Sequence, residues 1–253
     1  MNEFVETTIG DGVATITIDR AERHNSLVPA LVDELDDAVA AIDGDDAVRA
    51  AVLQTAGDSF STGGDVAAFY EHRDTIVEYA ERTVGGLHDV VIDLIDLDAA
   101  VVAAVDGQVT GGSLGLLLAA DVVVLGPDAR IRPFYASVGF SPDGGWTAIL
   151  PQTIGVTRTA EILLTDATIQ PATAVEWGIA TELVTDETVR TVAHRRAETI
   201  ASMHPGVVAS TKRLLGAHRR RVPERLAAER VAFVEQIQTD EALAGMEAFL
   251  DGG

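Results

Sequence analysis

Apolar positions along the first half of the chain predict strands and helices in alternation. Short runs of β-branched and small apolar residues, typical of buried strands, occur at residues 13–19, 48–55 and 121–125. A helical stripe between the first two consists of Leu27, Leu31, Leu35 and Ile42. Asn25 or Ser26 can cap that helix, and a longer helical pattern covers residues 74–96. Strands that alternate with helices indicate a parallel βαβ sheet.

One stretch, residues 101–121 (VVAAVDGQVTGGSLGLLLAAD), joins a buried strand to a short apolar helix. The chain turns at Asp106 and Gly107, and Gly111 and Gly112 tighten the backbone again before the helix begins. The first amides of a helix have no internal partner, so they stabilise an oxygen that gains negative charge. This order predicts an anion hole at Gly112; a buried helix after a glycine turn is the alternative.

A second glycine loop, AGDSFSTGGDVAAF at 56–69, ends in Gly63 and Gly64, and Asp65 is placed to cap the next helix. After Gly144 the pattern is helical almost to the end. Helices are predicted over residues 145–150, 157–164, 171–177, 186–203, 205–221, 223–237 and 239–250. The last three carry too many apolar residues for a free arm, so we expect them to pack on another subunit.

Composition limits the classes of protein that fit. A chain of 253 residues, 47% hydrophobic, can bury one core, or a core with a helical appendage. The absence of cysteine excludes disulfides, thiolate metal sites and a thiol nucleophile. The N-terminal sequence MNEFVETTIGDG has no signal-peptide pattern, and no apolar run is long enough to span a membrane, so we expect a cytoplasmic protein.

The charge is strongly acidic, with 40 Asp and Glu residues against 18 Lys and Arg residues and a formal net charge of −22. Such a surface repels nucleic acid and anionic membranes, so neither is expected as a partner. The excess of carboxylates suggests a halophilic protein that works in concentrated salt, where screening removes the self-repulsion. A melting temperature that does not rise with molar KCl would contradict this hypothesis.

Five segments resemble, in order and spacing, the signature segments of the crotonase family, the enoyl-CoA hydratases and isomerases. They are RHNSL at 23–27, SFSTGGD at 59–65, AAVVAAVDGQVTGGSLGLLLAAD at 99–121, VGFSPDGGW with LPQTIG at 138–155, and TAVEWGIATELV at 173–184. The resemblance covers nearly the whole chain. It implies an α/β fold, a ClpP-like spiral of ββα units over residues 1–185 with a helical trimerisation region over 186–253, and a homotrimer or hexamer.

The same resemblance implies an acyl-CoA thioester as substrate, with its carbonyl between two backbone amides. By position these are the amides of Thr62 and Gly112, and the loop with Arg23 and Ser26 is expected to contact the nucleotide part of CoA. Further residues expected to contact the substrate are Ser61, Gly63, Gly64, Asp65, Gly111, Gly115, Tyr135 and Phe249. No separate cofactor and no metal are expected, because CoA is part of the substrate. The chain after Phe249 is shorter than the basic tail of family members, which implies weaker CoA binding.

The chemistry depends on side chains that depart from the family's hydratases. The two glutamates of those enzymes are replaced here by Gly115 and Tyr135. Hydration needs one group that activates water and another that protonates carbon, so their loss argues against an efficient hydratase. Asp143, in the SPDGG loop, lies where some isomerases of the family have their only acid. One carboxylate can move a proton along an enoyl thioester, so we predict a double-bond isomerase with Asp143 as acid and base.

Several alternatives stay open. Asp143 in a Pro-Asp-Gly sequence is also an ordinary turn residue, and Tyr135 could orient it or line the acyl pocket. The spacing of His88 resembles that of the general base of aroyl-CoA dehalogenases, in which the residue matching Asp143 is a nucleophile; a surface histidine is the favoured interpretation. The remaining alternatives are a hydratase with a non-standard acid and base, a non-catalytic CoA-binding scaffold, and a serine hydrolase whose elbow is GGSLG at 111–115.

Overall fold

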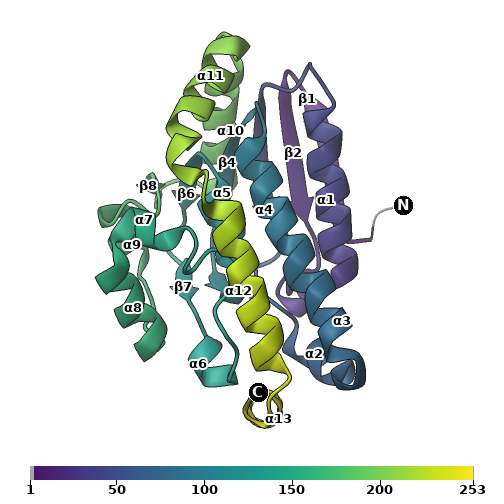
Figure 1. The fold of residues 1–253 in the computed structure, drawn as a ribbon. Helices are drawn as coiled ribbons and strands as arrows, with labels where there is room; N and C mark the ends of the chain where they lie inside the picture. The colour runs from purple at the N-terminus through teal and green to yellow at the C-terminus, as the bar shows by residue number, and fades with distance from the viewer. Residues whose placement is uncertain (1–2, 253) are drawn as a thin grey trace.

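A six-stranded sheet runs through the molecule, in the order β1-β2-β3-β4-β6-β8 (Figure 1). Its strands are β1 Val5–Gly10, β2 Val13–Ile18, β3 Ala50–Thr55, β4 Ala100–Val105, β6 Val122–Leu125 and β8 Glu182–Leu183. All neighbours are parallel except β1 and β2. The computed structural model describes residues 3–252, apart from the side chains of residues 217 and 218. The predicted parallel sheet is therefore confirmed.

Strand β1 was not predicted, although the chain carries a signal for it. It forms a hairpin with β2 through Asp11 and Gly12, whose φ angles are 51° and 79°. Two successive residues with positive φ are what a tight hairpin turn requires, and Asp-Gly supplies them. The edge of the sheet is thus closed by a strand whose outward side chains are polar, such as Glu6 and Thr8.

The two faces of the sheet bury alternate residues of each strand, as the period of two requires. Helices α1 (Pro29–Asp43) and α4 (Gly86–Asp96) lie over one face, and α10 (Val189–Ala201) covers the other. The face under α10 consists of Val13, Ala50, Val52, Val102, Ala104 and Val124. Because α10 packs directly on the strands, a boundary after residue 185 does not separate two packing units.

The other helices follow in chain order. They are α2 Val66–Glu71, α3 Ile76–Ala80, α5 Leu114–Ala119, α6 Tyr135–Val138, α7 Leu150–Ile154, α8 Val156–Thr165, α9 Pro171–Glu176, α11 Pro205–Leu215, α12 Val222–Ile237 and α13 Asp240–Asp251. A π-helical turn, Glu81–Gly85, joins α3 to α4, so the predicted long helix is interrupted. A small parallel sheet pairs β5 (Gln108–Thr110) with β7 (Arg130–Arg132). Among residues 3–252 no helix is long and apolar enough to cross a membrane.

Two predictions about helices need correction. Helix α1 begins after Val28, and Asn25 and Ser26 lie in the preceding loop without capping it. Residues 145–149 form turns and not a helix. Of the last three helices, α12 packs on α3 and α4, and α13 packs on α2 and α6. All three helices leave large apolar side chains exposed, namely Val207, Leu214 and Leu215 on α11, Val231 on α12, and Phe249 and Leu250 on α13. Assembly into a trimer or hexamer stays a prediction.

Candidate active site

The side chain of Asp143 lies at an apolar cavity between the two glycine loops. The cavity is lined by Leu27, Thr62, Gly64, Val66, Phe69, Thr83, Val84, Leu87, Thr110, Gly111, Gly112, Pro133, Phe134, Tyr135, Val138, Phe140, Asp143 and Phe233. Asp143 is only 4% exposed and is the one carboxylate in this lining. Asp143 does begin a turn, because Trp146 N–H lies 3.4 Å from its carbonyl oxygen, but its side chain is enclosed at the cavity and does not face solvent.

Tyr135 holds this carboxyl group. Its hydroxyl lies 2.6 Å from Asp143 Oδ1 and 3.0 Å from the Asp143 carbonyl oxygen, and it donates to both. Tyr135 begins α6 directly after Phe134, which has a left-handed backbone (φ 62°), and this turn aims the ring back toward Asp143. Of the two roles considered for Tyr135, orienting Asp143 and lining the pocket, the structure contains both.

Burial raises the pKa of Asp143 to about 7. The hydrogen bond from Tyr135 acts in the opposite direction, and the nearby Glu229 adds to the increase. Burial also raises the pKa of Tyr135 well above its usual value, so the phenol stays a donor. A carboxyl group that is about half protonated near neutral pH is suited to both taking and giving a proton.

Gly112 lies directly against the Asp143 carboxyl group. A Cβ atom built on Gly112 would lie 2.8 Å from Asp143 Oδ2 and 2.9 Å from Leu87 Cδ2, so no side chain fits. Gly112 belongs to a 3₁₀ turn, Gly111–Ser113, that follows β5. Its N–H has no hydrogen-bond acceptor among the described residues, as is normal for the first turn of a helix.

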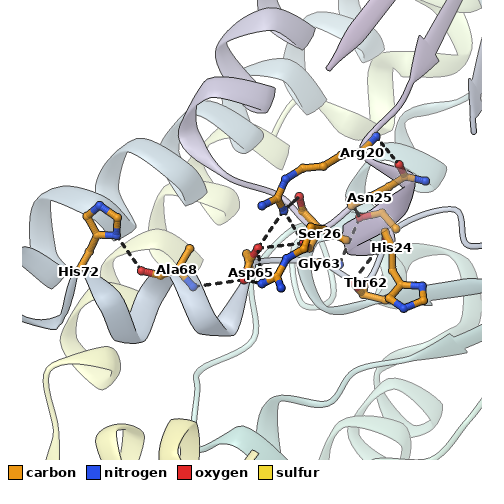
Figure 2. Close-up of polar contacts among 11 residues, drawn as sticks. Arg20, His24, Asn25, Ser26, Thr62, Gly63, Asp65, Ala68 and His72 are labelled. Carbon is orange, nitrogen blue, oxygen red and sulfur yellow. Dashed lines mark hydrogen bonds and ion pairs between the residues drawn. The ribbon is translucent and has the colours of Figure 1, made fainter. Parts of the chain in front are cut away.

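The second free amide is that of Gly64 and not that of Thr62. The Thr62 N–H donates to the carbonyl of His24 at 3.1 Å (Figure 2), so the prediction that it binds the substrate oxygen is wrong. On either side of Gly64, the Gly63 carbonyl accepts from Leu27 N–H and the Asp65 N–H donates to the Leu27 carbonyl. These bonds leave the Gly64 N–H without an acceptor among residues 3–252.

A polar cluster fixes the loop that carries Gly64 (Figure 2). The Asp65 carboxylate accepts from Arg20 Nη1 at 2.9 Å, from Arg23 Nη2 at 3.0 Å and from Ser26 Oγ at 3.2 Å. It also accepts from Ala68 N–H and so caps α2, as the sequence predicts. Burial alone would raise the pKa of Asp65, but the donors from the two arginines and the helix lower it below its usual value.

Several side chains expected to contact the substrate are used inside the protein. Ser26 and Asp65 bind each other, and Ser61 Oγ donates to the Asn25 carbonyl at 2.7 Å. The three side chains are buried and lie outside the cavity lining, so their predicted contact with the substrate is not supported. Arg23 keeps half of its side chain exposed.

Three further residues expected at the substrate lie outside the cavity lining. Gly63 packs against the Thr110 carbonyl, which a Cβ atom would approach to 2.6 Å. Gly115 packs in the same way against the Gly144 carbonyl, at 2.8 Å, so a larger side chain does not fit there. Phe249 is exposed on α13.

His88 is buried beside Asp143, so the interpretation as a surface histidine is wrong. Its Nε2 atom accepts a hydrogen bond from Gly144 N–H at 3.1 Å and lies 3.8 Å from Asp143 Oδ2. Burial, followed by the charge of Arg230, lowers the pKa of His88 to about 4. The ring is therefore neutral, and because Nε2 accepts a hydrogen bond, its proton is on Nδ1. Nδ1 makes no hydrogen bond of normal geometry. The backbone of Leu226 lies near it and favours the protonated form.

Ser113 does not fit the serine hydrolase alternative. The residue is fully buried, and its Oγ donates to the Thr110 carbonyl at 2.7 Å and the Ser61 carbonyl at 3.0 Å. A nucleophilic serine needs an exposed oxygen beside a base. No group of three potential metal-ligating side chains is found in the described part of the chain.

Known proteins resemble this chain over most of its length. The family described as enoyl-CoA hydratase/isomerase matches residues 8–253. Probable enoyl-CoA hydratase echA12 of Mycobacterium bovis is 34% identical over 80% of this chain and 73% of its own. 4-Chlorobenzoyl coenzyme A dehalogenase-2 of an Arthrobacter species is 31% identical over 70% of this chain and 64% of its own.

Solved structures share the fold. The enoyl-CoA hydratase of Bacillus halodurans superposes with a TM-score of 0.90 at 22% identity, covering 97% of this chain and all of the other. Pseudomonas aeruginosa OdaA has a TM-score of 0.88 at 27% identity, covering 98% of this chain and 99% of the other. The segments that resemble the crotonase signatures are thus placed on the crotonase fold. The chain belongs to the enoyl-CoA hydratase/isomerase family, within the crotonase superfamily.

Proposed function

We propose that the protein shifts the double bond of an enoyl-CoA thioester, with Asp143 as the acid and base. The observation that carries this proposal is that Asp143 is the single carboxylate in the cavity lining and lies against Gly112, a glycine with a free amide. Such a site has one group that moves protons and a neighbouring donor for a developing oxyanion.

The reaction follows from these groups. The thioester oxygen accepts hydrogen bonds from the N–H groups of Gly64 and Gly112. The ionised Asp143 takes a proton from the carbon next to the thioester, and the negative charge spreads to the oxygen as a dienolate. The protonated Asp143 then returns the proton two carbons along the chain. One well-aimed amide contributes about 3 to 4 kcal/mol to such a step, because it interacts most strongly with the charged oxygen.

The surroundings support proton shuttling by one group. A pKa of about 7 places Asp143 where it gives up and regains a proton with little cost, and Tyr135 fixes its direction. The apolar rings and aliphatic side chains of the cavity exclude water, which keeps the abstracted proton on Asp143. A hydratase needs a second acid or base, and the described lining holds no other carboxylate.

The experiment is to assay the Asp143→Asn variant on a panel of 2-enoyl, 3-enoyl and aroyl CoA thioesters. Asparagine keeps the shape and the hydrogen bond from Tyr135 but has no basic oxygen. We expect turnover of the best thioester to fall by about 1000-fold, within the usual range for a lost general base. The control Asp128→Asn, an exposed acid away from the cavity, keeps wild-type turnover. A loss smaller than tenfold for Asp143→Asn would contradict the proposal.

A second candidate is aroyl-CoA dehalogenation, with Asp143 as the nucleophile. It is favoured by the 3.8 Å distance between His88 Nε2 and Asp143 Oδ2, and by the 31% identity to a protein named as a dehalogenase. In that reaction the carboxylate displaces halide from the ring, and water then hydrolyses the aryl ester. Against it, the Nε2 lone pair already accepts from Gly144 N–H.

The two candidates leave different marks on Asp143. In a single turnover in H₂¹⁸O, hydrolysis of an aryl ester puts ¹⁸O into the Asp143 carboxyl group, which peptide mass spectrometry detects. Isomerisation leaves the carboxyl oxygens unlabelled and, because Asp143 returns the proton that it has taken, moves that hydrogen along the product carbon chain with little uptake of deuterium from D₂O. We expect the second result, and a hydroxyacyl product from a 2-enoyl thioester would instead indicate hydration.

A further inference from the structure

A buried glutamate on a C-terminal helix holds the segment that follows Asp143. Glu229, on α12, is only 4% exposed. Its Oε1 atom accepts from Thr147 N–H at 2.7 Å, from Thr147 Oγ1 at 2.7 Å and from Ala148 N–H at 2.8 Å. Its Oε2 atom accepts from Gly145 N–H at 2.9 Å. One carboxylate thus accepts four donors from a loop more than 80 residues away in the chain.

This loop has little stiffness of its own. Gly144 and Gly145 have φ angles of 60° and 90°, a backbone form that other residues rarely adopt. A Cβ atom on Gly144 would lie 2.2 Å from the Gly112 carbonyl oxygen, so glycine is required there. Two successive glycines directly after Asp143 would let its carboxyl group move unless the backbone beyond them is anchored.

Two other anchors connect the loop to the site. The Gly144 N–H donates to His88 on α4, and the Trp146 indole N–H donates to the Gly111 carbonyl at 2.8 Å. Gly111 precedes the glycine that lies against Asp143. The loop is therefore held between α4, α12 and the Gly111–Ser113 turn, and Glu229 supplies most of its hydrogen bonds.

We propose that Glu229 is a positioning residue for the acid and base Asp143. It fixes the loop that sets the distance of the Asp143 carboxyl group from Gly112, and its negative charge disfavours ionisation of Asp143. This inference rests on the proposed role of Asp143. The charge effect agrees with the finding that Glu229 contributes to the raised pKa of Asp143. The helices after residue 186 then serve the reaction as well as the packing.

The chemistry requires a carboxylate here. A carboxylate has two acceptor oxygens, whereas the amide of glutamine has one oxygen and one nitrogen that only donates. In Glu229→Gln the oxygen can keep the contacts with Thr147 and Ala148, but the amide nitrogen would face the Gly145 N–H, donor against donor. The substitution therefore removes the charge and releases Gly145, two residues after Asp143, while conserving volume.

The test compares Glu229→Gln with Glu235→Gln, which removes an exposed charge from the same helix. We expect kcat of Glu229→Gln to fall by about 100-fold, the loss typical of a reacting group displaced by ~1 Å, with KM changed less than threefold. The acidic limb of its kcat/KM profile should move to lower pH, because the charge that raises the pKa of Asp143 is gone. Glu235→Gln should match the wild type in both respects. Glu229→Asp, which keeps the charge, should lose kcat but retain the position of the limb.

The outcomes separate this inference from the proposed function. If Asp143→Asn is inactive while Glu229→Gln changes only the melting temperature, Glu229 is merely structural and the inference is overturned. If Asp143→Asn stays active, both are overturned. If Glu229→Gln does not fold, Thr147→Val removes one of the four donors and keeps the charge. We then expect a three- to tenfold lower kcat at unchanged KM, and an unchanged kcat would overturn the inference.

Discussion

The Tyr135 hydroxyl donates a 2.6 Å hydrogen bond to Asp143 Oδ1, at a cavity lined mostly by apolar side chains. A hydrogen bond to an ionised carboxylate favours the charged form, so this contact lowers the pKa of Asp143 while burial raises it. The balance leaves the pKa at about 7. Tyr135 is therefore the group that keeps a useful fraction of Asp143 ionised at neutral pH.

Replacing Tyr135 by Phe removes that donor and leaves the ring in place. We expect the pKa of Asp143 to rise, so the acidic limb of the kcat/KM profile moves up by about one pH unit. Turnover at pH 7 should fall by about fivefold, as the ionised fraction of Asp143 does, and recover in part at pH 8.5. A pH–rate series on the best thioester of the panel measures this. A limb that stays in place would show that the phenol does not set the pKa of Asp143.

Two buried groups make opposite contributions to stability as the pH changes. The pKa of Asp143 is raised from 3.8 to about 7, so its contribution is full below pH 4 and is lost as pH rises through 7. The pKa of His88 is lowered from 6.5 to about 4, so its contribution is present above pH 6.5 and is lost as pH falls toward 4. In the wild type the two slopes partly cancel between pH 4 and pH 6.5.

Single substitutions separate the two effects. Relative to the wild type, Asp143→Asn should become more stable by up to about 4 kcal/mol as pH rises from 4 to 8. The wild type gains stability from neutral His88 as pH rises from 4 to 6.5, and His88→Gln does not. The free energy of unfolding of His88→Gln should therefore fall relative to that of the wild type by up to about 3 kcal/mol over this range. Urea unfolding at several pH values measures both differences. Parallel curves for a variant and the wild type would contradict the burial of that charge.

The sequence was sufficient for the elements that depend on local pattern. The alternation at residues 14, 16 and 18 led to the correct strand β2, and the resemblance to the family's isomerases, not a local pattern, indicated Asp143. Asp65 caps α2 because a side chain three residues before an amide reaches it whatever the tertiary context. His88 lies four residues after Val84 and three before Val91, both buried, so the helical period does indicate its burial.

The remainder depends on contacts that no local pattern encodes. Thr62 and Gly64 lie in the same glycine loop, and no local pattern tells which of their amides is free. The difference comes from tertiary contacts, because the His24 carbonyl accepts from Thr62 N–H and the Leu27 carbonyl accepts from Asp65 N–H and not from Gly64 N–H. Glu229 is one acid in a helix with several, and its role appears only when the loop after Asp143 is placed next to it. One sequence signal could have identified Glu229. It lies three residues after Leu226 and four before Phe233, so the helical period places its charge within an apolar stripe.

Gly112→Ala tests the close contact of Asp143 with the turn. The added methyl group would lie 2.8 Å from Asp143 Oδ2, so the carboxyl group must move away from the thioester. We expect about a 100-fold loss of kcat, as for other small displacements of a reacting group, with the fold retained. Gly206→Ala is the control, since a Cβ atom there meets nothing within 4 Å. Wild-type kcat in Gly112→Ala would contradict the proposed position of the substrate carbonyl.

Asp65→Ala tests the polar cluster that fixes the Gly64 loop. The substitution leaves Arg20, 14% exposed, without its carboxylate and removes the cap of α2. Breaking a buried ion pair in this way costs about 3 to 5 kcal/mol of unfolding free energy. Because the pKa of Asp65 is lowered in the folded state, the difference from the wild type should be largest above pH 4 and shrink as pH falls through that lowered pKa.

The control for Asp65→Ala is Asp33→Ala, which breaks an ion pair with Arg82 of the same 2.9 Å length in which both side chains are more than half exposed. Exposed pairs contribute about 0 to 1 kcal/mol, so this variant should unfold almost like the wild type. Activity provides a second readout, because movement of the Gly64 amide lowers kcat only if that amide binds the substrate oxygen. If Asp65→Ala is destabilised but keeps its kcat at a temperature where it is folded, Gly64 does not hold the oxyanion.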